Sequence, residues 1–393
     1  MTTSSLRITF AACLIFWAFV FSDSGWGPIL TPLSTQLHIS LTTAGLFYVI
    51  WSTGYLPGAL VGGAMLDRYG PRRVLFGATL IILCGMLSIY LGLQLPHLVP
   101  LMALLLIAGL AGIGGGVIDA TTNGLISATF ARRRGMALNL FNLLYPLGGV
   151  LVALNDAVLL TLFHNDPRPS FIFTICFIAC AMFSLIAMPG TYSIRSEETH
   201  PNDESAKASP SLLIVILAPV IVVMMLTSGI SSSVRAWSPS YLHIAFGQTP
   251  AIAAALSSIT WALSTVSRLG AAALILRIGS WRMVTLGIVV TLLGLVAMML
   301  SSNAIIATLA IALTSIGLSP IFATSLAIGS ERAGRSLGSV AGILLFTSGI
   351  SVVFCGWFFG FLLNTLGPLW AVLFCFTSVT LGGLMALRLR PGH

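Results

Sequence analysis

The stretch GAMLDRYGPRR, residues 63–73, separates two long apolar segments of the chain. It gathers Asp67, Arg68, Arg72 and Arg73 around Gly70, although only 7% of the whole chain is charged. Soluble proteins carry about 25% charged residues, so this chain cannot cover a water-facing surface of ordinary composition. Charges concentrated between apolar segments are typical of loops that join membrane-spanning helices. We therefore expect residues 63–73 to lie at a membrane surface.

Apolar segments of this kind recur along all 393 residues, of which 57% are hydrophobic. A helix of about 20 apolar residues crosses the bilayer core of about 30 Å. Continuous apolar runs predict helices rather than the short alternating strands of a barrel. The sequence predicts twelve membrane-spanning helices, at residues 8–33, 41–65, 73–94, 98–129, 135–162, 170–190, 211–242, 249–275, 282–301, 304–329, 337–363 and 367–387.

The basic residues lie mainly on one side of these predicted helices. With a cytoplasmic N-terminus, 15 of the 18 fall at cytoplasmic ends: Arg7, Arg68, Arg72, Arg73, Arg132, Arg133, Arg134, Arg195, Lys207, Arg277, Arg282, Arg332, Arg335, Arg388 and Arg390. This asymmetry predicts a multi-pass protein of the cytoplasmic (plasma) membrane with both termini in the cytoplasm. Because the charge of +8 follows topology, it does not indicate a nucleic-acid partner.

The loop has a second copy later in the chain. In ALILRIGSWR, residues 273–282, three positions repeat the loop at an offset of 209: Arg277, Gly279 and Arg282 match Arg68, Gly70 and Arg73. A polar stretch at residues 191–210 lies between the two copies. We expect a six-helix bundle over residues 1–190, a cytoplasmic linker over 191–210 and a second six-helix bundle over 211–393. Such an internal repeat indicates transport by two halves that rock about a central site.

Residues 63–73 resemble the loop signature of the major facilitator superfamily, in which a glycine and three residues precede Asp-Arg-x-Gly and basic residues. The resemblance extends over essentially the whole chain. It implies an all-α membrane protein of twelve transmembrane helices in two pseudo-symmetric six-helix bundles. It also implies a functional monomer whose partners are a small-molecule substrate and the lipid bilayer.

The resemblance implies a gate at the cytoplasmic ends of the helices. Its expected residues are Asp67, Arg68, Gly70, Arg73, Arg134, Arg277, Gly279 and Arg282. Asp67 can meet the positive end of a neighbouring helix, and Arg132, Arg133 and Arg134 offer it partners. Leu276 replaces the acid in the second copy, which predicts a one-sided latch. Alternatively, some of these arginines only enforce topology.

A candidate coupling residue lies in GIGGGVIDATTN, residues 112–123. This segment resembles the fucose and glucose permease branch of the superfamily, where an acid is followed four residues later by asparagine, as Asp119 is by Asn123 here. Asp119 lies 13 positions before Arg132, about 20 Å along a helix and so near the membrane centre. Intramembrane acids mark ion pathways, although a structural acid paired with a base is the alternative.

An acid and a base occupy related positions in the two halves. FSDSGWGPIL, residues 21–30, and SSSVRAWSPS, residues 231–240, share a Trp-x-Pro pattern and carry Asp23 and Arg235. Arg235 can bind an anionic group of the substrate, since its guanidinium suits a carboxylate or phosphate. Alternatively, Asp23 and Arg235 pair to close the outer side, or merely neutralise each other.

Further candidates for substrate binding flank these charges. Trp26 and Trp237 can stack on a sugar ring or belong to the membrane-interface belt. Asn139, Asn142 and Tyr145 precede a Pro-Leu-Gly-Gly segment that partly resembles an exporter signature. We expect the prolines of the two Trp-x-Pro patterns to kink their helices. Arg268 is expected to extend toward the cytoplasmic surface.

These features favour a secondary active transporter of a small polar solute, with a sugar preferred and a proton gradient as the energy source. The alternatives are an exporter of drugs or organic anions and a sensor that binds solute without moving it. No nucleophile elbow or phosphate-binding loop occurs in the sequence, so an enzyme or an ATP-driven pump is not expected. Neither a metal site nor a cofactor is expected, and the six cysteines suit packing.

Overall fold

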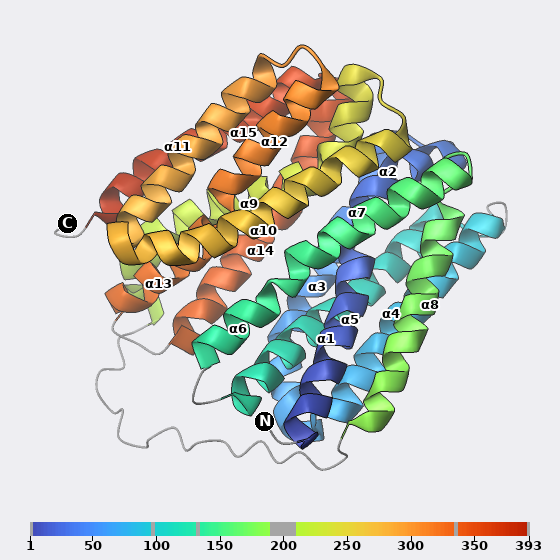
Figure 1. Cartoon of the computed structure of the whole chain (residues 1–393), viewed down its shortest axis with the longest axis horizontal. Helices are drawn as coiled ribbons and strands as arrows, with labels where there is room; N and C mark the ends of the chain where they lie inside the picture. Colours follow the sequence, from blue (N-terminus) through green and yellow to red (C-terminus); the bar gives the residue numbers. More distant parts are fainter. Residues whose placement is uncertain (1–2, 96–98, 131–133, 189–209, 334–336, 391–393) are drawn as a thin grey trace.

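The computed structural model describes residues 3–95, 99–130, 134–188, 210–333 and 337–390, and these are almost entirely helical (Figure 1). The helices are α1 (Thr3–Ser24), α2 (Trp26–Gln36), α3 (Leu41–Tyr69), α4 (Pro71–Gln94), α5 (Leu101–Thr129), α6 (Arg134–Asn142), α7 (Leu144–Leu162), α8 (Arg168–Ser184), α9 (Pro210–Phe246), α10 (Pro250–Ile278), α11 (Ser280–Met299), α12 (Ala304–Leu318), α13 (Ile321–Ala333), α14 (Leu337–Thr365) and α15 (Pro368–Ala386). Short 3₁₀ turns at Leu185–Ala187 and Leu387–Leu389 follow α8 and α15.

The prediction of twelve spanning segments is confirmed. Eleven helical stretches are long and apolar enough to cross a bilayer, and the shorter apolar helix α8 occupies the remaining predicted position. Large apolar side chains such as Leu106, Val158 and Leu293 stay more than half exposed, as lipid-facing residues do.

Three of the predicted segments are each built from two helices. The chain breaks between α1 and α2, between α6 and α7, and between α12 and α13. Pro28, Pro146 and Pro320 lie within three residues after these breaks, where a missing N–H and the ring disfavour a continuous helix. At the second Trp-x-Pro pattern the helix is not interrupted, because α9 runs unbroken through Pro239, and the kink expected there stays a prediction. Pro239 has no N–H to donate to the carbonyl of Arg235, four residues earlier. The hydroxyl of Ser238 donates to that carbonyl instead (3.2 Å).

Two separate hydrophobic cores form from the two halves of the chain. One core consists of α1–α8 residues, and the other is built mainly from α9–α15. The halves meet where α7 packs along α10, α2 along α9 and α3 along α14. In Figure 1 the N-terminus lies at the bottom and the C-terminus at the left edge, both at the end of the helices that carries the loops around Gly70 and Gly279. We call this the basic end, and the other the far end.

The internal repeat is visible in the backbone of those two loops. Gly70 joins α3 to α4 at φ 77° and ψ 157°, and Gly279 joins α10 to α11 at φ 82° and ψ 162°. Each N–H caps the preceding helix, on Leu66 (3.0 Å) and Ile275 (2.9 Å) respectively. Positive φ favours glycine, so the glycines of the two motifs serve the same turn.

Candidate functional site

A cavity lies between the two halves of the protein. The residues that line it come from both halves, from the four helices α3, α7, α9 and α10 and from the α1–α2 break: Asp23, Ser24, Gly27, Tyr48, Tyr145, Ser232, Arg235, Ala236 and Trp261. Its volume is about 30 Å³, room for about two water molecules in this conformation. We call it the central cavity. Three residues predicted from sequence, Asp23, Tyr145 and Arg235, meet there.

Asp23 is held by donors from its own half of the protein. The indole N–H of Trp51 donates to one carboxylate oxygen (2.9 Å), and the hydroxyl of Tyr145 donates to the other (2.6 Å). Short bonds of this kind to a carboxylate are about twice as strong as neutral ones. Asp23 therefore keeps its position without a basic partner.

Arg235 faces the same cavity from the other half. One guanidinium nitrogen donates to the hydroxyl of Ser231 (2.6 Å), and the carbon of the guanidinium lies 5.5 Å from the centre of the Trp261 ring. Among the described residues, no ion pair joins Arg235 to an acid. In this conformation the predicted pair with Asp23 is therefore not formed, although both side chains line one cavity.

Asp119 lies in a second polar cluster, which belongs entirely to the first half of the protein. It accepts hydrogen bonds from the hydroxyl of Tyr55 and from the amide of Asn123 (2.8 Å). The amide of Asn142, at the end of α6, donates to Asn123 (2.9 Å) and extends the cluster. The sequence brought Asp119, Asn123 and Asn142 forward, and the structure joins them in one chain of hydrogen bonds. The side chain of Asn139 lies outside the described residues.

An aromatic ring separates this cluster from the central cavity. Phe19 stacks on Tyr55 at 5.9 Å between ring centres and lies 6.3 Å from Tyr145. The two tyrosines bind Asp119 and Asp23, respectively. The two carboxylates are thus connected through three adjacent rings of α1, α3 and α7, none of which the sequence alone linked.

The two tryptophans of the repeat do not line the central cavity. Trp26 is 1% exposed and stacks on Phe47, and Trp237 is also 1% exposed and donates to the carbonyl of Gly356 (2.9 Å). Trp237 also packs against Gly45, across the contact between the halves. In this conformation both rings are therefore packing residues, in place of the stacking or interface-belt roles that we expected.

From the sequence we expected Arg268 to extend to the basic end, but it does not. Its guanidinium Nε donates to the hydroxyl of Ser319 (3.2 Å), at the break between α12 and α13. Arg268 is also close enough to Arg235 for the two charges to repel each other. The second half of the protein therefore presents two arginines near the cavity, and neither forms an ion pair within the described residues.

The far end is closed by direct contact between the halves. The hydroxyls of Thr31 in α2 and Ser240 in α9 are 3.2 Å apart, and these residues lie 209 positions apart. Gly27 approaches the backbone of Ala236 so closely that an added Cβ would lie 2.9 Å from its carbonyl oxygen. The repeat thus supplies both sides of this closure.

The predicted latch at the basic end is not formed by described residues. Asp67, Arg68, Arg73, Arg277 and Arg282 are exposed, and the guanidinium of Arg68 lies over the ring of the next residue at 5.3 Å. Arg132 and Arg133 lie outside the described residues, as does the side chain of Arg134. The latch between these arginines and Asp67 stays a prediction.

Sequence reasoning missed one intramembrane acid. Asp156 lies in α7, is 3% exposed and keeps one carboxylate oxygen without a hydrogen-bond partner in the described structure. The signal was available, since Asp156 interrupts the apolar segment 135–162 just as Asp119 interrupts 98–129. The aromatic partners Tyr48, Tyr55 and Trp261 carried no comparable signal, because apolar helices contain many such rings.

Comparison with known proteins agrees with this architecture. The sequence model of the Major Facilitator Superfamily matches residues 12–355. A D-xylose–proton symporter has a similar structure, with a TM-score of 0.79 and 15% identity over 99% of this chain and 98% of that chain. A nucleoside transporter, NupG, has a TM-score of 0.73 and 11% identity over 99% of this chain and 98% of that chain.

Curated relatives match over shorter stretches. A hexuronate transporter of Bacillus subtilis is 30% identical over 122 residues, which are 30% of this chain and 27% of that protein. A 3-(3-hydroxy-phenyl)propionate transporter of Escherichia coli is 37% identical over 101 residues, which are 25% of this chain and 24% of that protein. The matches thus span about a quarter of the relatives' length. With the family model covering most of the sequence and the fold agreeing, the chain belongs to the Major Facilitator Superfamily, a family of transporters and not of enzymes.

Proposed function

We propose that the chain is a secondary active transporter that moves a small hydroxylated organic anion, such as a sugar acid, together with protons. The observation that carries the proposal is the guanidinium of Arg235 in the central cavity, bound to Ser231 but to no described acid. A guanidinium offers a planar fork of donors that matches a carboxylate. The names of the two curated relatives, which denote transporters of a hexuronate and of an aryl propionate, support an anionic substrate.

The distribution of charge around the cavity favours an anion on the side of the second half. Asp23 is bound by Trp51 and Tyr145, which belong to its own half. Arg235 and Arg268 belong to the other half, and their repulsion is relieved when an anion lies near them. The sequence analysis favoured a sugar as the substrate, and the proposal keeps the hydroxyl groups of such a substrate because hydroxyl side chains also line the cavity. The hydroxyl of Ser24 is buried there without a partner in the described structure.

The acids of the first half support proton coupling. When a buried carboxylate takes up a proton, the net charge of the cavity rises, and an anion then binds more favourably. Asp23 is adjacent to the proposed anion site, and Asp119 is connected to it through Tyr55, Phe19 and Tyr145. We propose import of the anion with protons, with the basic end in the cytoplasm and the protein in the plasma membrane.

The test of the proposed substrate class is ligand-induced thermal stabilisation of the purified protein. Two panels are matched in size: sugar acids and aryl propionates on one side, and the neutral sugars and amides on the other. A ligand at 100 times its dissociation constant adds about 2.7 kcal/mol to the stability of the folded state. We expect stabilisation by the anions only. Stabilisation by a neutral sugar, with none by its acid, would restore the sugar preference and remove the anion from the proposal.

Replacing Asp119 by asparagine is expected to uncouple transport from the proton gradient. The amide keeps the shape of the side chain: its oxygen can accept from Asn123, and its NH₂ group can donate to the hydroxyl oxygen of Tyr55, but it cannot exchange a proton. In proteoliposomes, uptake driven by an imposed pH gradient should fall at least tenfold, whereas exchange of labelled for unlabelled substrate should continue. Asp166→Asn, in the α7–α8 connection, is the matched control. Gradient-driven accumulation that survives in Asp119→Asn would exclude Asp119 as the coupling residue.

A further inference from the structure

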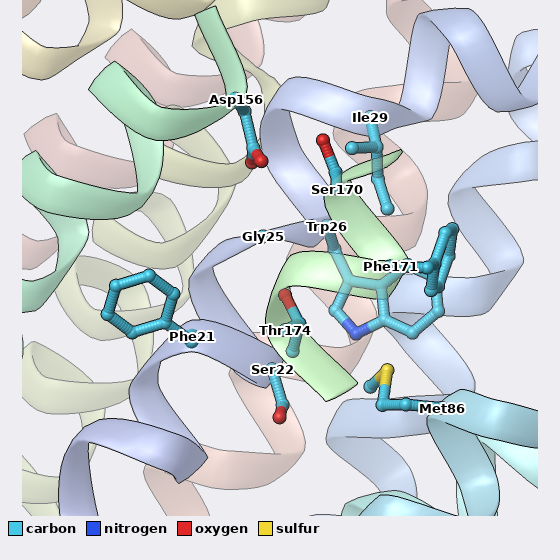
Figure 2. A pocket seen from close by; sticks show the side chains of 10 residues that line it. All are labelled: Phe21, Ser22, Gly25, Trp26, Ile29, Met86, Asp156, Ser170, Phe171 and Thr174. Carbon is cyan, nitrogen blue, oxygen red and sulfur yellow. The ribbon is translucent and has the colours of Figure 1, made fainter. Parts of the chain in front are cut away.

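A second pocket lies inside the first half of the protein, separate from the central cavity (Figure 2). It is formed where α1 breaks into α2, together with α4, α7 and α8. Its lining residues are Phe21, Ser22, Gly25, Trp26, Ile29, Met86, Asp156, Ser170, Phe171 and Thr174. We call it the Asp156 pocket.

Buried polar atoms without partners gather around this pocket. One oxygen of the Asp156 carboxylate, the hydroxyl of Ser170 and the indole N–H of Trp26 have no hydrogen-bond partner in the described structure. The side chains of Asp156 and Ser170 are 3% and 4% exposed. Buried polar groups in native proteins are nearly always satisfied, by protein, water or an ion. Figure 2 shows the carboxylate of Asp156 pointing into the space between α7, α8 and the α1–α2 break.

The charge of Asp156 also lacks compensation. Its other oxygen accepts a long hydrogen bond from Asn155 (3.4 Å), and the hydroxyl of Ser170 lies near enough to interact with the carboxylate. No described basic residue forms an ion pair with Asp156. An isolated charge in a low-dielectric interior costs several kcal/mol unless it is paired or coordinates an ion. The pocket therefore suits a ligand that carries positive charge.

The C-terminal end of the first helix lies beside this pocket. α1 ends at Ser24, and the next residue, Gly25, lines the pocket. The C-terminal end of a helix carries partial negative charge, and such ends of broken helices coordinate cations in other transporter folds.

We propose that the Asp156 pocket binds a monovalent cation, Na⁺, with the Asp156 carboxylate as its charged ligand and the hydroxyls of Ser170 and Thr174, together with water, as neutral ligands. A single carboxylate neutralises one positive charge, whereas sites for divalent ions use several carboxylates. In the described residues, no group of three or more His, Cys, Asp or Glu side chains gathers at any place that would suit such an ion. A water molecule that coordinates the cation can accept a hydrogen bond from the indole N–H of Trp26.

This site is connected to the central cavity through adjacent residues of α1. Ser22 lines the Asp156 pocket and Asp23 lines the central cavity, so a cation at one face of the break fixes the residue that binds at the other. A bound cation also joins α7 to α8 beside the α1–α2 break. We expect it to stabilise one arrangement of the first half and to raise the affinity for substrate.

The experiment is a sodium titration of the thermal unfolding temperature of the purified full-length protein, with choline chloride holding the ionic strength constant. We expect a saturable increase with Na⁺ in the wild-type protein. Asp156→Asn should remove the increase, and the matched control Asp166→Asn, an acid at the same end of the protein, should keep it. Because protons compete for the carboxylate, the half-saturating Na⁺ concentration should rise as the pH falls.

The outcomes separate the cation site from its alternatives. A wild-type protein with no Na⁺-dependent increase overturns the proposal, and so does an increase that persists in Asp156→Asn. If Asp156→Asn does not fold, Ser170→Ala decides, since it keeps the carboxylate and should raise the half-saturating concentration several-fold. Arg235→Ala should leave the sodium response unchanged, so failure of the anion proposal and failure of the cation proposal are distinguishable.

Discussion

Arg235→Ala is expected to abolish most transport of an anionic substrate. The guanidinium of Arg235 lines the central cavity. Its partners are the hydroxyl of Ser231 and the ring of Trp261, and no described acid pairs with it. Loss of charge-assisted hydrogen bonds to a substrate carboxylate costs about 3 kcal/mol, which is roughly a 100-fold decrease in kcat/KM. Initial rates of uptake into proteoliposomes, at several substrate concentrations, measure this decrease.

Two further variants show whether the shape of the guanidinium matters or only its charge. Arg235→Lys keeps the positive charge but loses the donor fork and the planar stack on Trp261, so we expect an intermediate loss of about 10-fold. Arg7→Ala removes an exposed arginine of α1 and should leave uptake unchanged. Equal uptake by Arg235→Ala and the wild-type protein would show that the anion binds elsewhere.

The main features of the fold could be predicted from the sequence because the membrane imposes them. The apolar length of each segment, the side on which arginine accumulates and the repeated loop at Gly70 and Gly279 are all local properties of the chain. Helix breaks were harder to predict. The chain is interrupted before Pro28 and is continuous through Pro239, although both prolines occupy the same place in the repeat. The difference depends on what satisfies the freed carbonyl, which for Pro239 is the hydroxyl of Ser238.

The candidate site could be predicted only in part, because the sequence of one helix does not determine which residues of another helix it contacts. An ionisable residue in an apolar segment identified Asp23, Asp119 and Arg235, and each lies in a polar cluster of the structure. Which aromatic ring serves as a donor and which as packing could not be predicted. Trp51, which the sequence did not bring forward, binds Asp23, whereas Trp26 is buried among other rings.

Another property that only the structure shows is how closely α3 and α5 approach. Gly54, Gly58 and Gly62 of α3 face the backbone of α5, and an added Cβ at Gly58 would lie 2.1 Å from the carbonyl oxygen of Ile113. In the other direction, a Cβ at Gly116 would lie 2.1 Å from the carbonyl oxygen of Tyr55. Small residues that recur at four-residue intervals let membrane helices pack backbone to backbone. The hydrogen bond between Tyr55 and Asp119 crosses this same contact.

Gly58→Val is therefore expected to be among the most destabilising single substitutions in the first half. A backbone carbonyl cannot move aside as the end of a flexible side chain can, so α3 and α5 must separate. Overpacking of this kind costs about 1–3 kcal/mol in soluble cores, and more where the backbone itself is displaced. Because Tyr55 lies less than one turn away, the separation should also weaken its hydrogen bond to Asp119 and with it the coupling of transport to the proton gradient.

Gly63→Val supplies the matched control, since it lies in the same helix and an added Cβ there meets nothing within 4 Å. Both variants receive the same β-branched side chain, so the small helix-propensity cost of valine cancels in the comparison. Thermal unfolding in detergent should show a marked decrease in the unfolding temperature for Gly58→Val and almost none for Gly63→Val. Similar decreases in both would mean that valine acts through helix propensity and that α3 and α5 do not depend on close packing. A decrease confined to Gly58→Val would show that the glycine pattern of α3 and α5 sustains the close contact that the Tyr55–Asp119 hydrogen bond crosses.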